Sequence, residues 1–328
     1  MKILLRVLGC CLMFAAVPGN ARDTIDRVLL FPQLHVGQII RYRIGYRAAT
    51  STNTESTVVA PMAPTGGQTN ASIILQVEVE DTRLEAGRPL VRLRTRILEP
   101  DLAASPSGAS ANGAQDSNGA GDSANRGKVV ELTLQSDGKV ADVQGLEKLS
   151  ADERAAWQEW VERFGGGAAL PEKGVKAGEK WKTEEPISNA LLAGLSWEKE
   201  SQYVNDTPCS AMNITPKGEL APAPQAQETC AVILTTATLK QKSSPKDATP
   251  EDYMLHDLRT AGTAQGTNEI ITYISLKTGL VVRATEDANQ SMSVTVATSN
   301  GSNRVQYTIA AESHARVLLL ADAPDNHP

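Results

Sequence analysis

The chain has 328 residues, a formal net charge of −6 and only 4% aromatic residues. This length allows one large β domain or two smaller ones. The excess of acidic residues argues against nucleic acid and anionic membranes as bulk partners, because both attract proteins with excess positive charge.

The first 21 residues have the pattern of a secretory signal peptide. Lys2 and Arg6 precede an apolar stretch at residues 7–17, and small residues follow up to Ala21. We therefore expect cleavage after Ala21 and export to the periplasm or the cell exterior. The mature chain, residues 22–328, then has a net charge of −8, because Lys2 and Arg6 are the only charges removed. No later segment offers the roughly 20 apolar residues of a transmembrane helix.

Two of the four cysteines belong to this signal segment. The VLGC sequence ending at Cys10 resembles a lipoprotein cleavage site, but the apolar stretch before it is too short for one. Cys209 and Cys230 remain after cleavage, and in an oxidising compartment an even pair predicts one disulfide. Residues 210–229 are proline-rich with little periodicity, so we expect an irregular loop between two neighbouring antiparallel strands.

Several segments alternate apolar and polar residues, as strands with one buried face do. The runs at residues 73–80 and 91–97 predict a hairpin whose outer face sets glutamates opposite arginines. The other predicted strands are residues 40–46, 130–134, 140–143, 197–204, 229–241, 262–276, 279–286, 291–298 and 304–320.

One helix is predicted at residues 150–164. Ser150 and Glu153 have the spacing of a capping box, and Trp157, Trp160 and Phe164 recur at helical intervals. A second, shorter helix is predicted at residues 186–195.

Residues 101–128 are almost entirely Ala, Ser, Gly, Asn and Asp. This composition predicts a disordered insertion, because it cannot bury enough apolar surface to offset the entropy of ordering. The chain as a whole therefore reads as mainly β (α+β), with residues 22–328 in one domain. We expect a curved antiparallel sheet, or two continuous half-sheets resembling a half-barrel, around one amphipathic helix.

Two segments open in a similar way, FPQLHVGQIIRY at residues 31–42 and LPEKGVKAGEKW at residues 170–181. In each, a proline ends the preceding element and a glycine supplies an unusual backbone conformation. The aromatic residues that follow, Tyr42 and Trp181, are expected on the buried face of a new strand.

Together with SDGKVADVQGL and LKTGLVV, the second of these segments resembles a family of uncharacterised secreted bacterial β-rich proteins with an LPxKxVxxGxxW pattern. The resemblance covers roughly residues 129–298. More distantly, the layout is similar to the open half-barrel of periplasmic lipoprotein carriers. That similarity implies an apolar concavity and assigns no functional residues.

Two groups of side chains are candidate binding residues. Trp157, Trp160 and Phe164 could line a cleft for a lipid or a sugar, although a single helical stripe favours core packing. The arginines of a second group could bind an anionic ligand, although Glu78 and Glu80 favour a neutralised outer face. This group comprises Arg41, Arg43, Arg92, Arg94 and Arg96.

Catalytic patterns are weak in this sequence. Ser196 and Lys199 form an S-x-x-K match, but the second box of a penicillin-recognising site would follow on the same strand. The histidines do not have zinc-ligand spacing, so we expect no metal site and no cofactor. We predict an exported, non-enzymatic protein that binds a lipid or another apolar or amphipathic ligand. The alternatives are a structural or protein-interaction module that meets an envelope protein, and a hydrolase with an unrecognised site.

Overall fold

The computed structural model describes residues 27–58, 63–85, 88–98, 128–135, 140–164, 170–171, 173–187, 190–215, 218–301 and 303–321. The predicted signal peptide, residues 1–21, lies outside these ranges. So does the predicted disordered insertion, except for Lys128. The backbone oxygen of Lys128 accepts a hydrogen bond from Ile97, so this residue belongs to the sheet.

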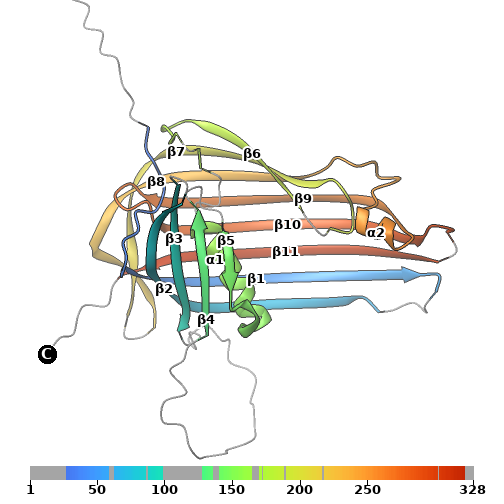
Figure 1. The fold of residues 1–328 in the computed structure, drawn as a ribbon, viewed down its shortest axis with the longest axis horizontal. Coiled ribbons are helices and arrows are strands. Elements are labelled where there is room, and N and C mark those ends of the chain that lie inside the picture. Colours follow the sequence, from blue (N-terminus) through green and yellow to red (C-terminus); the bar gives the residue numbers. More distant parts are fainter. Residues whose placement is uncertain are drawn as a thin grey trace, which may run out of the picture.

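Eleven strands form one continuous curved sheet, in the order β5-β4-β3-β2-β1-β11-β10-β9-β8-β7-β6 (Figure 1). All neighbours in this order are antiparallel, and one parallel residue pair joins Leu320 to Met212. The prediction of a mainly β protein with a curved antiparallel sheet is confirmed. The strands are β1 (Ile39–Ser56), β2 (Thr65–Glu85), β3 (Arg88–Leu98), β4 (Val129–Gln135), β5 (Val140–Gln144), β6 (Lys180–Pro186), β7 (Leu195–Ile214), β8 (Leu220–Gln241), β9 (Leu258–Ser275), β10 (Val281–Thr298) and β11 (Arg304–Leu320).

The long helix α1 (Ala151–Phe164) begins at the predicted capping box. The Ser150 amide donates to the Glu153 carboxylate over 2.7 Å, and the Glu153 amide donates to the Ser150 hydroxyl. A short helix, α2 (Glu251–Leu255), was not predicted. None of the helices in the described ranges is long and apolar enough to span a membrane.

The second helix predicted at residues 186–195 is wrong. The described part of this segment turns back on itself, because the Ile187 amide bonds to the carbonyl of Leu195. The Ala193 amide bonds to the distant carbonyl of Ala248, and Gly194 adopts a φ of 68°. Its hydrogen bonds therefore go to other segments rather than along a helix axis.

At one end of the sheet, strands β1 to β5 curve around α1 and enclose the main core (Figure 1). We call this the closed end. Tyr42, Ile44 and Leu75 of the sheet are fully buried there, as are Trp157 and Trp160 of the helix. Three of the four tryptophans, Trp157, Trp160 and Trp181, pack in this core, where large rings bury much apolar surface.

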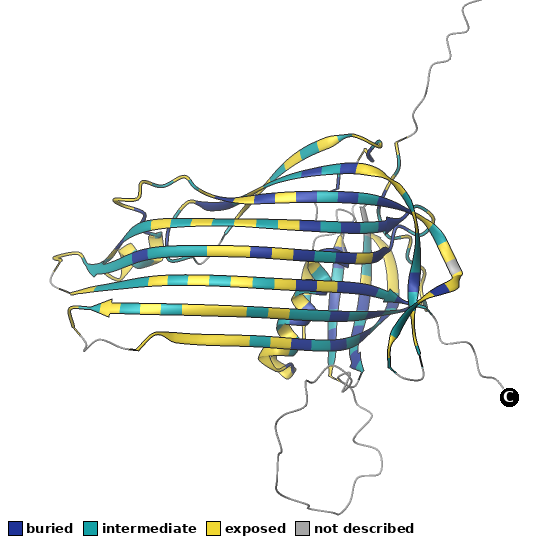
Figure 2. Cartoon of the chain, turned by 180° about the vertical axis from the view of Figure 1, so that it is seen from behind, coloured by how far each residue is buried: buried dark blue, intermediate teal, exposed yellow. Residues whose placement is uncertain are grey.

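At the other end, β1, β2, β9, β10 and β11 extend well beyond α1, and we call this the projecting end (Figure 1). Its core is a small separate cluster in which Leu192, Leu239 and Val294 are buried. Burial along the strands falls accordingly, from dark blue at the closed end to teal and yellow at the projecting end (Figure 2).

The predicted disulfide between Cys209 and Cys230 is present, with Cα atoms 5.8 Å apart. The irregular loop predicted between them is wrong: β7 continues to Ile214, β8 starts at Leu220, and the two ends pair. The register shifts after Ser210, which leaves the prolines of β8 at an irregular edge where a missing N–H costs little. Beyond the disulfide, the hairpin reaches β11, where the Ala321 amide bonds to the Met212 carbonyl.

Both predicted strand openings have the expected geometry. Gly37 and Gly178 adopt φ values of 81° and 83°, a region that other residues resist. Tyr42 is then fully buried, and Trp181 packs against the same core while keeping partial exposure.

Candidate functional site

The three aromatic residues predicted as a ligand cleft lie inside the closed end. Trp157, Trp160 and Phe164 are at most 2% exposed. The Trp160 and Phe164 ring centroids are 4.8 Å apart, and Phe164 meets Tyr42 edge to face at 5.8 Å. This is core packing, the arrangement that the single helical stripe favours.

A buried polar contact fixes the orientation of the helix. The Trp157 indole N–H donates to the Thr95 hydroxyl over 2.9 Å, and Thr95 in turn donates to the carbonyl of Val130. Each buried donor therefore has an acceptor, and the chain of bonds links α1 to β3 and β4. The half-barrel interior at this end is occupied by the protein's own side chains.

The other end of α1 is closed by an ion network. Arg163, 8% exposed, pairs with Glu286 of β10 and with Glu159, 2.9 Å away on the preceding turn. Asn268 of β9 donates to the same Glu286 carboxylate. Because each charge has an opposite charge or a donor, this cluster stabilises the docking of α1 on the sheet.

The S-x-x-K residues are not brought together. Ser196 and Lys199 are three residues apart on β7, so their side chains point to opposite faces of the sheet. Lys199 pairs with Glu185 at 2.5 Å. Within the described residues, no group of three or more His, Cys, Asp and Glu side chains is placed to hold a metal ion.

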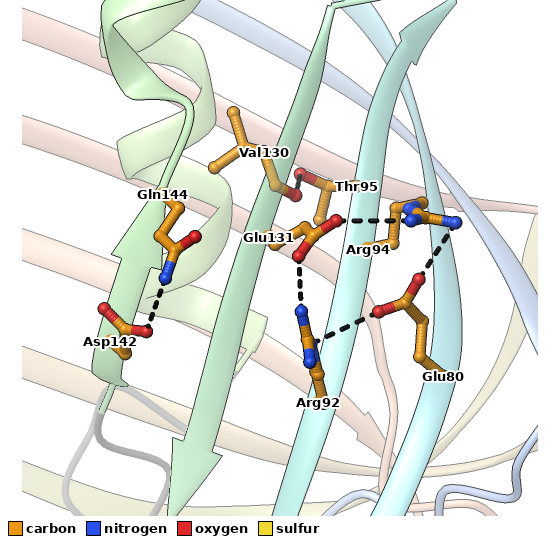
Figure 3. A network of polar contacts seen from close by, with 8 residues as sticks. All are labelled: Glu80, Arg92, Arg94, Thr95, Val130, Glu131, Asp142 and Gln144. Carbon is orange, nitrogen blue, oxygen red and sulfur yellow. Dashed lines mark hydrogen bonds and ion pairs between the residues drawn. The ribbon is translucent and has the colours of Figure 1, made fainter.

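Part of the predicted arginine stripe forms a closed charge network on the outer face (Figure 3). Arg92 and Arg94 of β3 each pair with Glu80 of β2 and Glu131 of β4, at distances from 2.6 to 3.4 Å. Hydrogen bonds from Arg92 and Arg94 hold the pKa of Glu131 below its ordinary value. These two arginines are neutralised, as the glutamates predicted, although Glu131 rather than Glu78 completes the network.

The two edges of the projecting end differ, and this difference defines the candidate interaction site. On one side, residues 243–250 cover β9: the Ala248 amide bonds to the Thr260 carbonyl, and the Gly262 amide to the Pro245 carbonyl. On the other side, residues 65–73 of β2 pair with β1, while β3 pairs with β2 only from Ile74 onward. Within the described residues, this stretch has a strand partner on one side only.

We call residues 65–73 the open edge. Its sequence, TGGQTNASI, contains no charge and no proline. Natural sheets protect long edges with lysine, proline or bulges. The opposite edge strand of the sheet, β6, shows such protection, since KWKTEEP is highly charged and ends in proline. The open edge spans about 30 Å at 3.3 Å per residue, enough to pair with another extended segment.

Surface cavities accompany these edges. One of about 370 Å³ lies between α2 and the segment around Leu192. A second, of about 520 Å³, crosses the middle of β8 to β11 among Thr, Asn, Gln and Ala residues. The largest, of about 610 Å³, lies between β1, β2, β11 and the tip of the β7–β8 hairpin. Trp157, Trp160 and Phe164 line none of these three cavities.

Comparisons with known proteins give little further guidance. No protein-family model matches the chain, and no curated protein matches it in sequence. A candidate lipoprotein from Parabacteroides distasonis is 9% identical, with 90% of this chain and 98% of that chain covered at a TM-score of 0.28. A candidate exported protein with a YmcC-like fold from Bacteroides fragilis is 8% identical, with 87% and 98% covered at a TM-score of 0.23. TM-scores this low do not establish a shared fold.

Proposed function

We propose that this chain is an exported, non-enzymatic interaction module that takes an extended segment of an envelope protein onto the open edge of β2. The observation that carries the proposal is the pairing of residues 65–73. Among the described residues, this uncharged stretch of β2 has a strand partner on one side only. Main-chain hydrogen bonds supply affinity in such complexes, and alternate side chains supply specificity.

Export is supported by two independent features. The N-terminal sequence has the charge and apolar pattern of a signal peptide. The Cys209–Cys230 disulfide is typical of compartments that keep thiols oxidised. The partner is therefore sought among proteins of the cell envelope.

A module is favoured over an apolar carrier because the closed end is packed. A carrier of the half-barrel type needs an apolar cavity of several hundred Å³. Here α1 fills the interior with Trp157, Trp160 and Phe164, each held against the sheet. The described cavities instead open on the surface and include polar or charged linings.

Site-directed photocrosslinking in the native host tests the proposal. A photoreactive residue replaces the exposed Gln68 of the open edge, or the exposed Thr308 of β11 as a matched control. Thr308 lies on a strand that is paired on both sides, with Asn53 and Ser293. We expect one discrete envelope-protein adduct from position 68 and none from position 308. The change Asn70→Lys, made in the chain that carries the photoreactive residue at position 68, should abolish this adduct, because lysine on an edge opposes strand addition.

Two outcomes contradict this proposal. Identical adducts from both positions would show that the edge is not selective. An adduct of twice the chain's mass would make a second copy of this chain the occupant of the edge.

An amphipathic ligand is the second candidate function, and the projecting end favours it. Met292, Val296 and Tyr307 are only partly buried against the small core there, and Leu255 of α2 is 76% exposed. Native mass spectrometry of protein purified from its own host, followed by lipid extraction, detects such a ligand. A stoichiometric bound lipid would favour this candidate over the interaction module.

A further inference from the structure

The largest of the three cavities described above lies on the outer face of the sheet, beneath the tip of the β7–β8 hairpin. Its sheet side carries Arg43 and Arg47 of β1 with Arg316 of β11, and its hairpin side carries Glu219. The cavity measures about 610 Å³, enough for a small-molecule group. Asn70, Ala71 and Ser72 of the open edge also line this cavity, but the inference rests on the arginines of β1 and β11 and not on strand addition to that edge.

Strand register explains how the arginines surround a single point. Arg43, Gly45 and Arg47 alternate along β1, so all three face the same side. Arg316 lies directly opposite Gly45 on β11, and Arg283 lies in the same row as Arg43, one strand beyond Leu318. Arginines of β1 and β11 therefore surround the one position in β1 that has no side chain, whereas the Arg283 guanidinium lies over the Tyr273 ring, 5.6 Å from its centroid.

Gly45 leaves space where a side chain would fit. A Cβ atom built at this position meets no heavy atom within 4 Å. Its φ is not among the positive values of the chain, so the backbone does not require glycine there. In a strand interior, such a glycine marks a place where another group approaches the backbone closely.

Two of the three arginines that line the cavity, Arg47 and Arg316, form no ion pair with a described carboxylate. Within the described residues, no carboxylate lies within 4.0 Å of the side-chain nitrogens of Arg47, Arg283 or Arg316, in contrast to Arg92 and Arg94 on the same sheet. His314, which also lines the cavity, contacts Asp287 at 2.7 Å.

Burial, followed by the positive charges of Arg283 and Arg43, lowers the pKa of Arg316. Like charges held together in this way are relieved by an anion. The cluster is therefore electrostatically prepared for a negatively charged group, although the chain as a whole is acidic.

We propose that this cavity binds the oxyanionic group of a phosphate, free or in a lipid headgroup, held by Arg43, Arg47 and Arg316 above Gly45. Guanidinium groups bind such anions through paired N–H donors in a fixed fork. The net negative charge of the chain argues that binding depends on this local geometry rather than on a general attraction for anions.

The test uses the mature protein and two probes. The probes distinguish a free phosphate from the phosphate of a lipid headgroup. Isothermal titration calorimetry with inorganic phosphate measures free anion binding. Flotation with phosphatidylglycerol vesicles measures a lipid phosphate. We expect saturable binding of at least one probe, and whichever binds identifies the source.

Three variants test whether the cavity is responsible for the binding of these probes. Gly45→Val fills the open space and keeps every charge, and Arg316→Gln removes one donor group; each should weaken binding about tenfold or more. Arg92→Gln removes the same charge from the neutralised network outside the cavity and should leave the affinity within about twofold. Circular dichroism confirms that each variant folds. If Arg316→Gln does not fold, the comparison of Gly45→Val with the wild type tests the cavity by itself.

The proposal is overturned if neither probe binds the wild-type protein. It is equally overturned if Gly45→Val binds as well as wild type, or if Arg316→Gln and Arg92→Gln weaken binding equally, because binding would then follow net charge.

Discussion

The closed end and the projecting end are built from the same strands but stabilised differently. In β1, the first half alternates buried and partly exposed residues around Tyr42 and Ile44, whereas the second half, TSTNTES, has no buried residue. β11 shows the opposite order, because it runs antiparallel and brings its buried Val317 beside Ile44. The same change runs along β9 and β10 in the middle of the sheet (Figure 2).

The difference teaches that strand formation and core formation are separable in this chain. Threonine favours strands because its β-branched side chain suits a pleated surface even when exposed. Hydrogen bonds between neighbouring strands continue to the tips, as the pairing of Ser56 with Val305 shows. The projecting end is therefore ordered by its ladders, while the closed end is ordered by burial.

The largest effect is expected at the closed end. Trp160→Ala removes a fully buried indole and should lower the free energy of unfolding by about 3 to 5 kcal/mol. Trp197→Ala is the matched control, since Trp197 packs only partly buried against the projecting-end cluster. Chemical denaturation measures both. Equal losses would show that the two ends do not differ in packing.

The second-largest effect on stability is expected from removal of the disulfide. Replacing both Cys209 and Cys230 by serine should cost about 3 kcal/mol, because the loop they close has a separation of 21 residues and its entropy returns to the unfolded chain. Thermal denaturation of the double variant, compared with the oxidised wild type, measures the loss. Two alkylatable thiols in unreduced, denatured wild type would contradict the bond itself.

The strands at the closed end could be predicted because burial imposes a two-residue period on sequences such as IIRYRIGY. The strands of the projecting end lack this two-residue period. β10 was predicted as two strands because its middle, around Asn289 and Gln290, is polar on both faces. The continuation of β7 and β8 past the disulfide was missed because prolines normally exclude strands, except at edges and irregularities.

The candidate sites were less predictable than the fold. The open edge requires knowing where β3 stops pairing with β2, which no local pattern reports. The cavity beneath the β7–β8 hairpin joins Arg43 and Arg47 to Arg316, which is more than two hundred positions away and is brought beside them only by strand register. The alternation of Arg43, Gly45 and Arg47 was its one local signal.

A third prediction concerns the projecting-end cluster. Leu239→Ala should cost about 2 kcal/mol, the lower limit for such a change, because the cluster around Leu192 and Val294 is small. Hydrogen exchange should accelerate in the outer halves of β9 and β10 and remain unchanged around Tyr42. Uniform acceleration would show that the two ends unfold as one unit.

A smaller effect is expected from shortening the insertion. Deleting residues 103–125 should change the free energy of unfolding by about 1 kcal/mol, because each halving of a flexible loop changes its closure cost by about 0.6 kcal/mol. Lys128 is retained, since its ammonium group pairs with Glu153 at 2.5 Å. Differential scanning calorimetry provides the comparison, and a fall in Tm of more than a few degrees would mean that the insertion packs against the sheet.

The smallest effect is a pH dependence on the outer face of the closed end. Arg92 and Arg94 lower the pKa of Glu131 from its ordinary value of 4.5, so the folded state binds that proton less readily than the unfolded chain does. Their stabilising contribution is therefore complete above about pH 5 and is lost as the pH falls through the lowered pKa. Exposure of both arginines to solvent keeps this contribution modest.

Glu131→Gln should flatten the decline of Tm between pH 5 and about pH 3, since glutamine cannot titrate. Glu312→Gln is the control from the projecting end, where no cation among the described residues lies within ion-pair distance of Glu312. All other carboxylates titrate equally in the two variants, so the difference between their slopes isolates the Arg92–Glu131–Arg94 network. Equal slopes would mean that this network, despite its short contacts, adds nothing to the stability of the closed end.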